Sequence, residues 1–411
     1  MIGAGPVGLA GAAHLRSRGL TPLVLETGDN VGAAIREWGH IRTFTPWRYI
    51  VDATAERLLG PSGWNRPDTD VPPPGDQLVA GYLEPLAAAL GESVVRTGTR
   101  VLAVSRQGLD KSCSLGREER PFVVRVDRAR AIHEILARAV VDASGTWRQR
   151  NPLGGSGLPA LGEAEAERAG FLVGPLPDVL GRDRHRFAGR GTLVVGMGHS
   201  AANTLLNLAE LARQEPDTRI LWAIRGYSPA RLYGGGDADP LAARGRLGAD
   251  LRCLVASGAV ELVTGFSTTR LTVDDDTVTV SGDSAGGEIR IPGVHNVAAA
   301  TGFHPDLAML SEVRLDLDPG LDAPRKLAPL IDPAYHSCGT VPPHGHRELA
   351  HPEPGFYVAG MKSYGRAPTF LITTGNEQVR SIAAAIAGDF TAADDIQLEL
   401  PETGVCSVAS L

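Results

Sequence analysis

Two short glycine-rich segments, almost half the chain apart, hold the residues most able to bind a charged ligand. They read Gly3-Ala4-Gly5-Pro6-Val7-Gly8 and Gly196-Met197-Gly198-His199-Ser200-Ala201. Glycine lets the backbone turn sharply and approach a ligand closely, and the free N–H groups at the start of a following helix attract phosphate. The two segments therefore predict two pyrophosphate-binding turns, and with them two bound dinucleotides.

The first segment follows the pattern G-x-G-x-x-G, with Pro6 inside the turn. We expect Gly3 to permit the tight turn, Gly5 to admit the pyrophosphate and Gly8 to let helix and strand pack closely. Glu26 ends the next strand, where a carboxylate accepts hydrogen bonds from ribose hydroxyls and would repel a 2′-phosphate. A generic tight turn between a strand and a helix is the alternative explanation.

The second segment predicts a different nucleotide. Gly196 and Gly198 form the turn, and Ser200 opens the helix, where it contacts the pyrophosphate or simply caps the helix. The next strand ends at Arg225, with no acidic residue at that end. An arginine there pairs with a 2′-phosphate, which favours NADPH over NADH, although a solvated surface arginine fits the same pattern.

The composition is that of a water-soluble globular protein of two or three domains, with 411 residues, of which 43% are hydrophobic and 21% charged. A net charge of −7 and the lack of a basic run argue against a nucleic-acid partner. We find no signal peptide and no apolar run long enough to span a membrane, so we expect a cytoplasmic protein without a membrane partner.

The cysteines and histidines predict no metal site. Four cysteines, Cys113, Cys253, Cys338 and Cys406, are scattered along the chain, which fits a reducing compartment and gives no zinc or local redox motif. His344 and His346 lie near Cys338, but their spacing matches no standard zinc pattern. Nearly all basic side chains are arginines, and the lysines are Lys111, Lys326 and Lys362.

The hydrophobic pattern predicts an α/β fold with two Rossmann-like βαβ units and antiparallel β-meander insertions. Residues 39–74 and 151–191 are rich in Pro and Gly and are expected to be irregular loops and a linker with some helix. We expect helices at 9–18, 78–90, 199–213 and 241–257, strands at 22–25, 139–142, 192–195, 220–224 and 294–300, meanders at 94–126 and 259–291, and a strand, turn and helix over 355–388.

The order of these motifs resembles that of flavin-containing monooxygenases and of the wider superfamily of two-dinucleotide-binding flavoproteins. The first glycine turn resembles the FAD fingerprint of that family. Glu26 followed by Gly28 and Gly32 resembles its acidic residue and glycine pair, with Ala33 in place of the second glycine of the pair. Trp38 and the following loop, 41–46, resemble the segment that lies near the flavin.

Further motifs extend the resemblance over nearly the whole chain. Ala143-Ser144-Gly145 and Ala300-Thr301-Gly302-Phe303 resemble the two crossings between the FAD and NADPH domains. Phe356-Tyr357-Val358-Ala359-Gly360 resembles the closing FAD strand, whose following backbone approaches the ribityl chain. Two features depart from the family: Met361 stands where many members have Asp, and the signature Phe-x-Gly-x-x-x-His before the second turn is absent.

The resemblance implies an oxidoreductase that uses FAD and NADPH, most consistent with a monooxygenase. In such an enzyme NADPH reduces the flavin, oxygen adds to the reduced flavin, and one oxygen atom passes to a small-molecule substrate. It also implies an FAD domain built from residues 1–155 and 296–411, with an NADPH domain at 156–295. Arg42 and Arg48 are the candidate catalytic cations that stabilise developing peroxide charge, and a structural ion pair or phosphate contact is the alternative for each.

Two other functional classes stay open. A reductase would pass electrons to a disulfide, a quinone or a metal, and disulfide reductases of this superfamily carry a close cysteine pair that the sequence lacks. Cys338 with Cys406 is the remaining candidate pair, and inert thiols are the alternative. A non-catalytic FAD-binding sensor would not need the second nucleotide turn.

The chain begins close to the first turn. Only Met1 and Ile2 precede Gly3, whereas strands usually run about five or six residues. We therefore expect several residues to be missing upstream, and flavin retention to rise when they are restored.

Overall fold

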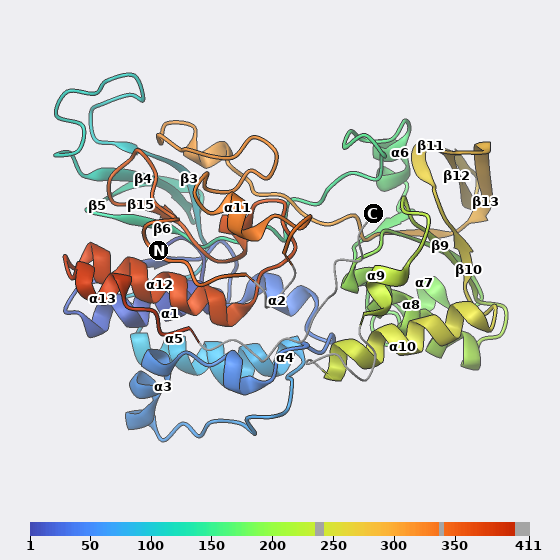
Figure 1. Ribbon diagram of the computed structural model, residues 1–411, viewed down its shortest axis with the longest axis horizontal. Coiled ribbons are helices and arrows are strands. Elements are labelled where there is room, and N and C mark those ends of the chain that lie inside the picture. The colour runs from blue at the N-terminus through green and yellow to red at the C-terminus, as the bar shows by residue number, and fades with distance from the viewer. Residues whose placement is uncertain (235–241, 337–340, 399–411) are drawn as a thin grey trace. The chain divides into compact units, whose positions relative to one another are not determined.

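The structure is a computed structural model that describes residues 1–234, 242–336 and 341–398. It divides into two compact units (Figure 1). Of the described residues, the first unit consists of Met1–Gln149 and those from His304 onward, and the second of those within Arg150–Phe303. The second unit is therefore an insertion into the first. The domain boundaries predicted from the sequence, at residues 155 and 296, lie a few residues inside the second unit.

A layer of parallel strands forms the centre of the first unit. Its strands pair two by two, β1 with β2 and β6 with β15, and Ile2 joins the pairs through parallel bridges to Leu25 and Asp142. The N-terminal residues thus occupy the central strand position from which the first glycine turn starts. The strands are β1 (Val24–Leu25), β2 (Val95–Arg96), β6 (Val140–Asp142) and β15 (Phe356–Val358).

The two faces of this layer are covered differently. On one face α1 and α12 pack together, with Val7 of α1 and Ile382 of α12 in one apolar cluster. On the other face an antiparallel meander packs through Val104 and Phe122 against Val140 and Phe356. Burial on both faces suits the apolar strands of a parallel layer. The covering elements are α1 (Pro6–Ser17), α12 (Ile372–Ile386), β3 (Thr99–Arg106), β4 (Phe122–Arg128) and β5 (Ala131–Ala137).

A further group of helices packs on α1. The prediction of a helix over 78–90 is confirmed, although the helix is continuous from Gly75 and includes a π-helical turn. The prediction of irregular loops over 39–74 is wrong for α3, because Asp52 accepts hydrogen bonds from the N–H groups of Thr54 and Ala55 and so caps a helix there. These helices are α3 (Ala53–Leu59), α4 (Gly75–Leu78), η3 (Val79–Leu83) and α5 (Glu84–Leu90).

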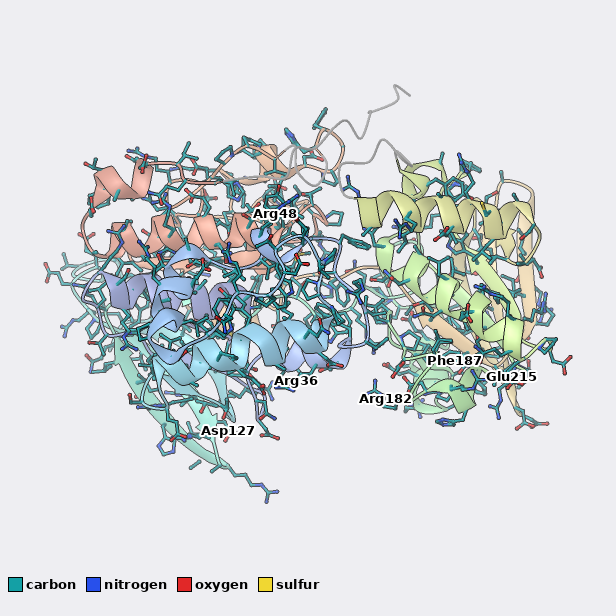
Figure 2. All side chains as sticks on the ribbon, turned by 90° about the horizontal axis from the view of Figure 1, so that it is seen from below. Arg36, Arg48, Asp127, Arg182, Phe187 and Glu215 are labelled. Carbon is teal, nitrogen blue, oxygen red and sulfur yellow. The ribbon has the colours of Figure 1, made fainter. Side chains whose placement is uncertain are left out.

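The second unit contains a parallel sheet in the order β10-β9-β8-β14-β7, as a Rossmann-like fold requires. An antiparallel meander packs on it, with Phe266 and Val280 against Leu193 and Leu221. The expected linker at 151–191 supplies the edge strand β7 and the short helix α7, whose Phe187 is fully buried (Figure 2).

The elements of the second unit are α6 (Glu163–Arg168), β7 (Leu172–Val173), α7 (Arg184–Phe187), β8 (Gly191–Val195), α8 (His199–Gln214), β9 (Arg219–Ala223), α9 (Ala230–Tyr233), α10 (Ala242–Ala256), β10 (Glu261–Val263), β11 (Ser267–Asp274), β12 (Thr277–Ser284), β13 (Gly287–Val294) and β14 (Asn296–Ala299). The shorter helices of the first unit are α2 (Ala33–Glu37), η1 (Trp47–Tyr49), η2 (Gly60–Ser62), η5 (Ala308–Leu310), α11 (Ala328–Ile331), η6 (Gly360–Tyr364) and α13 (Phe390–Asp394). Within the described part of the chain, every helix is too short or too polar to cross a bilayer.

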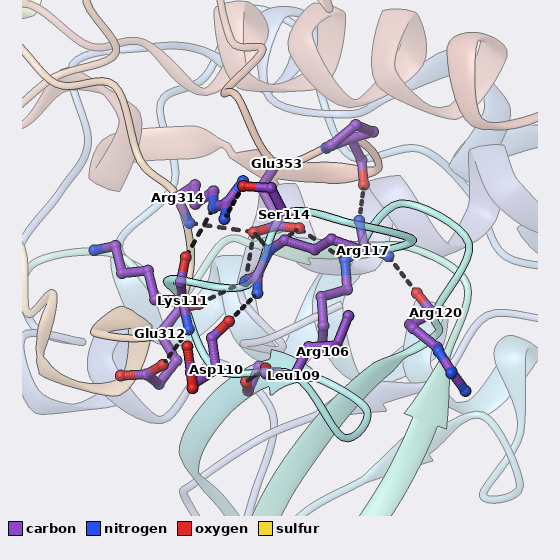
Figure 3. A network of polar contacts seen from close by, with 12 residues as sticks. Arg106, Leu109, Asp110, Lys111, Ser114, Arg117, Arg120, Glu312, Arg314 and Glu353 are labelled. Atoms are coloured by element: carbon purple, nitrogen blue, oxygen red, sulfur yellow. Dashed lines mark hydrogen bonds and ion pairs between the residues drawn. The ribbon is translucent and has the colours of Figure 1, made fainter.

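A buried carboxylate ties the meander to the chain that leads into β15 (Figure 3). Glu353 accepts hydrogen bonds from Nε of Arg106 at 2.8 Å and from Nε and Nη2 of Arg117 at 2.9 and 2.8 Å. All three side chains are buried. Burial alone would raise the pKa of Glu353, but the hydrogen bonds from Arg117 and Arg106 outweigh it and hold that pKa below its usual value.

Removing the charge of Glu353 should destabilise the first unit. We expect Glu353→Gln to lower its free energy of unfolding by about 3–5 kcal/mol, because two buried guanidinium groups lose their counter-charge. Since the folded-state pKa is depressed, the carboxylate stabilises the protein above its unfolded value of 4.5 and this contribution is lost as pH falls through the folded value. Wild type and variant should therefore converge in acid.

Urea unfolding followed by tryptophan fluorescence measures this effect, because Trp38, Trp47, Trp64 and Trp147 lie in the first unit and only Trp222 lies in the second. Glu134→Gln is the matched control, since its pair with Arg125 is about half exposed on both sides. Glu134→Gln should lower the free energy of unfolding by less than about 1 kcal/mol. If the two variants lose equal amounts of unfolding free energy, the buried Glu353 does not stabilise the first unit more than an exposed ion pair does.

Candidate functional site

The glycines of the first turn each meet a different constraint. Gly3 has a φ of +95°, and a Cβ on it would lie 2.8 Å from the carbonyl oxygen of Ala143. A Cβ on Gly8 would lie 2.0 Å from the carbonyl oxygen of Gly3. A Cβ on Gly5 would meet no atom within 4 Å. Two positions therefore require glycine for packing within the protein, whereas Gly5 borders open space that a ligand can enter.

The start of α1 is suited to an anion. Gly5 is its N-cap and provides no side-chain cap, Pro6 takes a first-turn position, and the first turn carries no acidic residue. The N–H groups at such a helix start have no partner within the helix and carry partial positive charge. A helix of 12 residues is long enough for this effect, so the turn can bind a phosphate.

Glu26 follows β1 directly and holds the turn in place. Its Oε2 accepts a hydrogen bond from the Ala4 N–H, and its Oε1 accepts one from the Gly28 N–H, both at 2.8 Å. The sequence had suggested only a contact to ribose hydroxyls. A carboxylate has about four acceptor positions, so each oxygen keeps capacity for a hydroxyl after binding these amides.

The candidate residues of the following loop lie on or near the surface. Trp38 is partly buried and packs beside Trp147, with ring centroids 6.5 Å apart. Arg42 is exposed and donates to the carbonyl oxygen of Pro72 at 2.6 Å. Arg48, labelled in Figure 2, is exposed and forms an ion pair with Asp70. Both arginines thus join the loop 42–48 to the loop 68–74. Such a structural contact was the alternative to a catalytic role for each arginine.

The segment that follows β15 contacts the start of α1. Gly360 has a φ of +69°, and a Cβ on it would lie 3.3 Å from Val7. Its N–H donates to Oε1 of Gln378 at 2.7 Å. Met361 follows in η6, and Gly145, with a φ of +71°, borders open space at the end of β6.

A buried histidine fixes the orientation of Gln378. The amide nitrogen of Gln378 lies 2.9 Å from Nε2 of His344, whose Nδ1 lies 3.0 Å from the carbonyl oxygen of Pro342. Burial lowers the pKa of His344, which favours the neutral ring. A neutral ring that donates from Nδ1 accepts at Nε2, and Gln378 then presents its carbonyl oxygen to Gly360.

A buried ion pair that we did not predict from the sequence lies beside the turn. Nζ of Lys362 lies 2.6 Å from Oδ2 of Asp142, and both side chains are fully buried. Nζ also donates to Oγ of Ser144 at 3.1 Å. A signal was present, because Lys362 is one of three lysines in an arginine-rich chain and follows the closing glycine.

The second turn repeats the geometry of the first. Gly196 has a φ of +128°, and a Cβ on it would lie 2.1 Å from the carbonyl oxygen of Ala300. Gly198 caps α8, provides no side-chain cap, and borders open space. Ser200 is the second residue of α8, so it is not the N-cap, and its candidate role is contact with a ligand.

Two further candidates lie near this turn in the second unit. Arg225 is exposed, two residues after β9, and Nη1 donates to the carbonyl oxygen of Gly155 at 3.3 Å. Gly302 has a φ of +90°, and a Cβ on it would lie 3.3 Å from Nδ2 of Asn151. Among the described residues the bond to Gly155 is the one hydrogen bond that the Arg225 guanidinium donates, so its other donors can contact a ligand.

The described cysteines do not form a redox pair. Cys113 lies in the first unit and Cys253 in the second, and both are free and exposed. Cys338 and Cys406, the candidate pair from the sequence, lie outside the described residues. Among the residues that are described, no group of three or more His, Cys, Asp or Glu side chains is placed to hold a metal ion.

A cavity of about 690 Å³ lies at the opposite end of α1 from the glycine turn. Its polar lining includes Arg18 and Arg380, which are already paired with Asp389 and Glu377. Because it is remote from the turn and its cations have partners, we assign the chemistry to the turn.

Comparisons with known proteins agree with this geometry. Residues 1–64 match the family described as NAD(P)-binding Rossmann-like domain. The structure is similar to bacillithiol disulfide reductase Bdr (YpdA) from Bacillus cereus, with a TM-score of 0.69 and 20% identity over 94% of this chain and 97% of that one. A comparison with curated proteins gave no match.

Two monooxygenases are also similar. The cadaverine monooxygenase DfoA from Erwinia amylovora, solved with FAD, has a TM-score of 0.64 and 15% identity over 100% of this chain and 98% of that one. A double mutant of a flavin monooxygenase from Stenotrophomonas maltophilia has a TM-score of 0.60 and 21% identity over 94% and 97%. The chain has the fold of two-dinucleotide-binding flavoprotein oxidoreductases. This two-domain flavoprotein fold hosts both reductases and oxygenases, so the type of reaction must be argued from the site.

Replacing Gly5 should separate ligand binding from stability. Gly5→Ala should cost less than about 1 kcal/mol of stability, because its backbone is extended and the added methyl group meets no protein atom. The same methyl group enters the space beside the free N–H groups, so we expect the affinity for ADP to fall at least about tenfold, the effect of losing a charge-assisted hydrogen bond.

Thermal unfolding and calorimetric titration with ADP measure the two effects. Gly8→Ala is the contrasting variant, since its Cβ would clash with Gly3 and should destabilise the protein by about 1–3 kcal/mol. If Gly5→Ala binds ADP with unchanged affinity, phosphate does not bind at this turn.

Proposed function

We propose that the protein is an oxidoreductase that binds FAD at the first glycine turn and NADPH at the second, and that it is a monooxygenase of a small molecule. The observation that carries the proposal is the repeated turn, in which Gly5 and Gly198 each border open space at an uncapped helix start. A protein that binds a single dinucleotide needs one such turn.

The residues beside each turn fit the two cofactors. Glu26 retains acceptor capacity for the ribose hydroxyls of FAD and carries the wrong charge for a 2′-phosphate. Arg225 is exposed after β9 and carries the right charge for the 2′-phosphate of NADPH. When bound, the flavin would supply hydride acceptance and oxygen activation, and the protein would supply binding and orientation.

The overall reaction of a monooxygenase balances as NADPH, H⁺, O₂ and substrate giving NADP⁺, water and the oxygenated substrate. Arg42 and Arg48 remain the candidate cations, although their contacts to Pro72 and Asp70 show that each already helps to hold a loop.

A disulfide reductase is the second candidate, because Bdr from Bacillus cereus and a thioredoxin reductase from T. acidophilum have this fold. Its reaction balances as NADPH, H⁺ and a disulfide giving NADP⁺ and two thiols, without oxygen. The sequence contains no close cysteine pair of the kind that disulfide reductases of this superfamily carry, which favours the monooxygenase.

The experiment that tests the proposal mixes the FAD-loaded protein with NADPH in the absence of oxygen and then admits oxygen. Rapid bleaching of the flavin by NADPH supports the use of both cofactors. A slowly decaying absorbance that precedes the return of oxidised flavin supports the monooxygenase. Direct reoxidation with one hydrogen peroxide per NADPH would contradict it, and absence of bleaching would contradict the use of NADPH.

The choice of NADPH can be tested at Arg225. Arg225→Ala should raise the KM for NADPH about 10- to 100-fold and leave that for NADH unchanged, because a hydrogen-bonded ion pair with the 2′-phosphate is lost. Arg219→Ala is the control, since Arg219 is exposed on β9 but pairs with Glu261 at 2.8 Å. Equal effects of Arg225→Ala on both nucleotides would contradict a contact between Arg225 and the 2′-phosphate.

A further inference from the structure

Tyr227 carries an exposed aromatic ring at the carboxyl edge of the parallel sheet in the second unit. It lies in the chain that follows β9, and 77% of its surface is exposed. In an open parallel sheet, ligands bind outside the carboxyl ends of the strands. The ring is therefore exposed at the edge of the sheet where a nucleotide is expected.

A glycine on the neighbouring strand supports one side of this ring. Gly265 follows β10 with a φ of +62°, and a Cβ on it would lie 2.8 Å from Cε1 and 3.1 Å from Cδ1 of Tyr227. The Gly265 N–H also donates to the carbonyl oxygen of Gly226 at 3.0 Å, which joins the two loops. The ring is thus held in place although it is exposed, and a group that is already ordered loses little entropy when a ligand binds.

The loop that carries Tyr227 also contacts the second glycine turn. A Cβ on Gly226 would lie 4.0 Å from Sδ and from Cε of Met197, which stands between Gly196 and Gly198 in that turn. Tyr227 is therefore the next residue in the chain after one that meets the turn.

The ring of Tyr227 and the guanidinium of Arg225 lie over the same short segment of chain. The guanidinium donates to the carbonyl oxygen of Gly155 at 3.3 Å, and a Cβ on Gly155 would lie 2.8 Å from the Cβ of Ser267. The ring lies against Gly265, two residues before Ser267. In a nucleotide the 2′-phosphate and the base are attached to adjacent carbons of one sugar. A nucleotide whose 2′-phosphate binds Arg225 therefore carries its base beside Tyr227.

We propose that Tyr227 stacks on the adenine of the NADPH bound at the second turn, and that Gly265 is a positioning residue that holds the ring. This inference rests on the proposed function and adds the residue that binds the base. Stacking uses the π-face of the base and is indifferent to the 2′-phosphate. Tyr227 therefore binds the part that NADPH and NADH share, whereas Arg225 binds the phosphate that only NADPH carries.

The first test separates the base from the rest of the nucleotide. Tyr227→Ala in the full-length protein should weaken the binding of adenosine 2′,5′-bisphosphate, measured by calorimetry, about 5- to 100-fold, as expected for the loss of one base–aromatic stack. It should raise the KM for NADPH and for NADH by the same factor. The KM for reduced nicotinamide mononucleotide, which lacks adenine, should not change.

Two further variants control this test. Tyr227→Phe keeps the ring and should bind adenosine 2′,5′-bisphosphate as the wild type does. Tyr335→Ala removes a tyrosine that is 74% exposed in the first unit and should change neither the affinity nor any KM. Both positions are on the surface, so folding should be preserved in all three variants.

The second test measures the action of Gly265 through Tyr227. Gly265→Ala places a Cβ where the ring lies, so it should weaken the binding of adenosine 2′,5′-bisphosphate and cause no further loss in the Tyr227→Ala background. Gly258→Ala is the matched control, because Gly258 has a φ of +75° but a Cβ on it would meet no atom within 4 Å. It carries the same backbone strain and should leave the affinity unchanged.

Each other result overturns the inference. Unchanged binding of adenosine 2′,5′-bisphosphate in Tyr227→Ala, or an equal rise in the KM for reduced nicotinamide mononucleotide, would show that the ring does not bind the base. A loss confined to NADPH would assign Tyr227 to the 2′-phosphate instead. Additive losses from Gly265→Ala and Tyr227→Ala would contradict the positioning role of Gly265. If the wild-type protein does not bind adenosine 2′,5′-bisphosphate, the proposed NADPH site itself fails.

Discussion

The close approach of Gly8 to the carbonyl oxygen of Gly3 determines where α1 begins, and the first unit is arranged around that point. A single added carbon on Gly8 would stand 2.0 Å from that oxygen. Because α1 starts so close to the parallel layer, the ends of β6 and β15 and the closing Gly360 all meet at its first turn. The open space beside Gly5 is what this packing leaves for a ligand.

The second unit satisfies the same constraint with different residues. Gly196 lies against the carbonyl oxygen of Ala300, and Gly198 borders open space at the start of α8. The two turns differ in the charge of their neighbours, since Glu26 follows the strand in one and Arg225 in the other. Two similar backbone geometries are thereby flanked by side chains of opposite charge.

The local features of the fold could be predicted from the sequence, whereas the long-range polar contacts could not. Glycine spacing and apolar runs identify both turns and most strands, because these depend on neighbouring residues. Lys362 is 220 residues from Asp142, and Arg106 is 247 from Glu353. No local pattern pairs such residues. The helix α3 was missed because its start depends on the cap from Asp52 in a segment rich in Pro and Gly.

The insertion of one unit into the other has a consequence for synthesis on the ribosome. β6 is made roughly 200 residues before its partner β15, and at ~5–20 residues per second the delay is about 10–40 s. During that time the edge of β6 lacks its neighbour, and the carboxylate of Asp142 lacks Lys362. Such an edge is prone to wrong pairing. The continuous segment Arg150–Phe303 can meanwhile complete its own sheet, so the nascent chain should finish its second unit before its first.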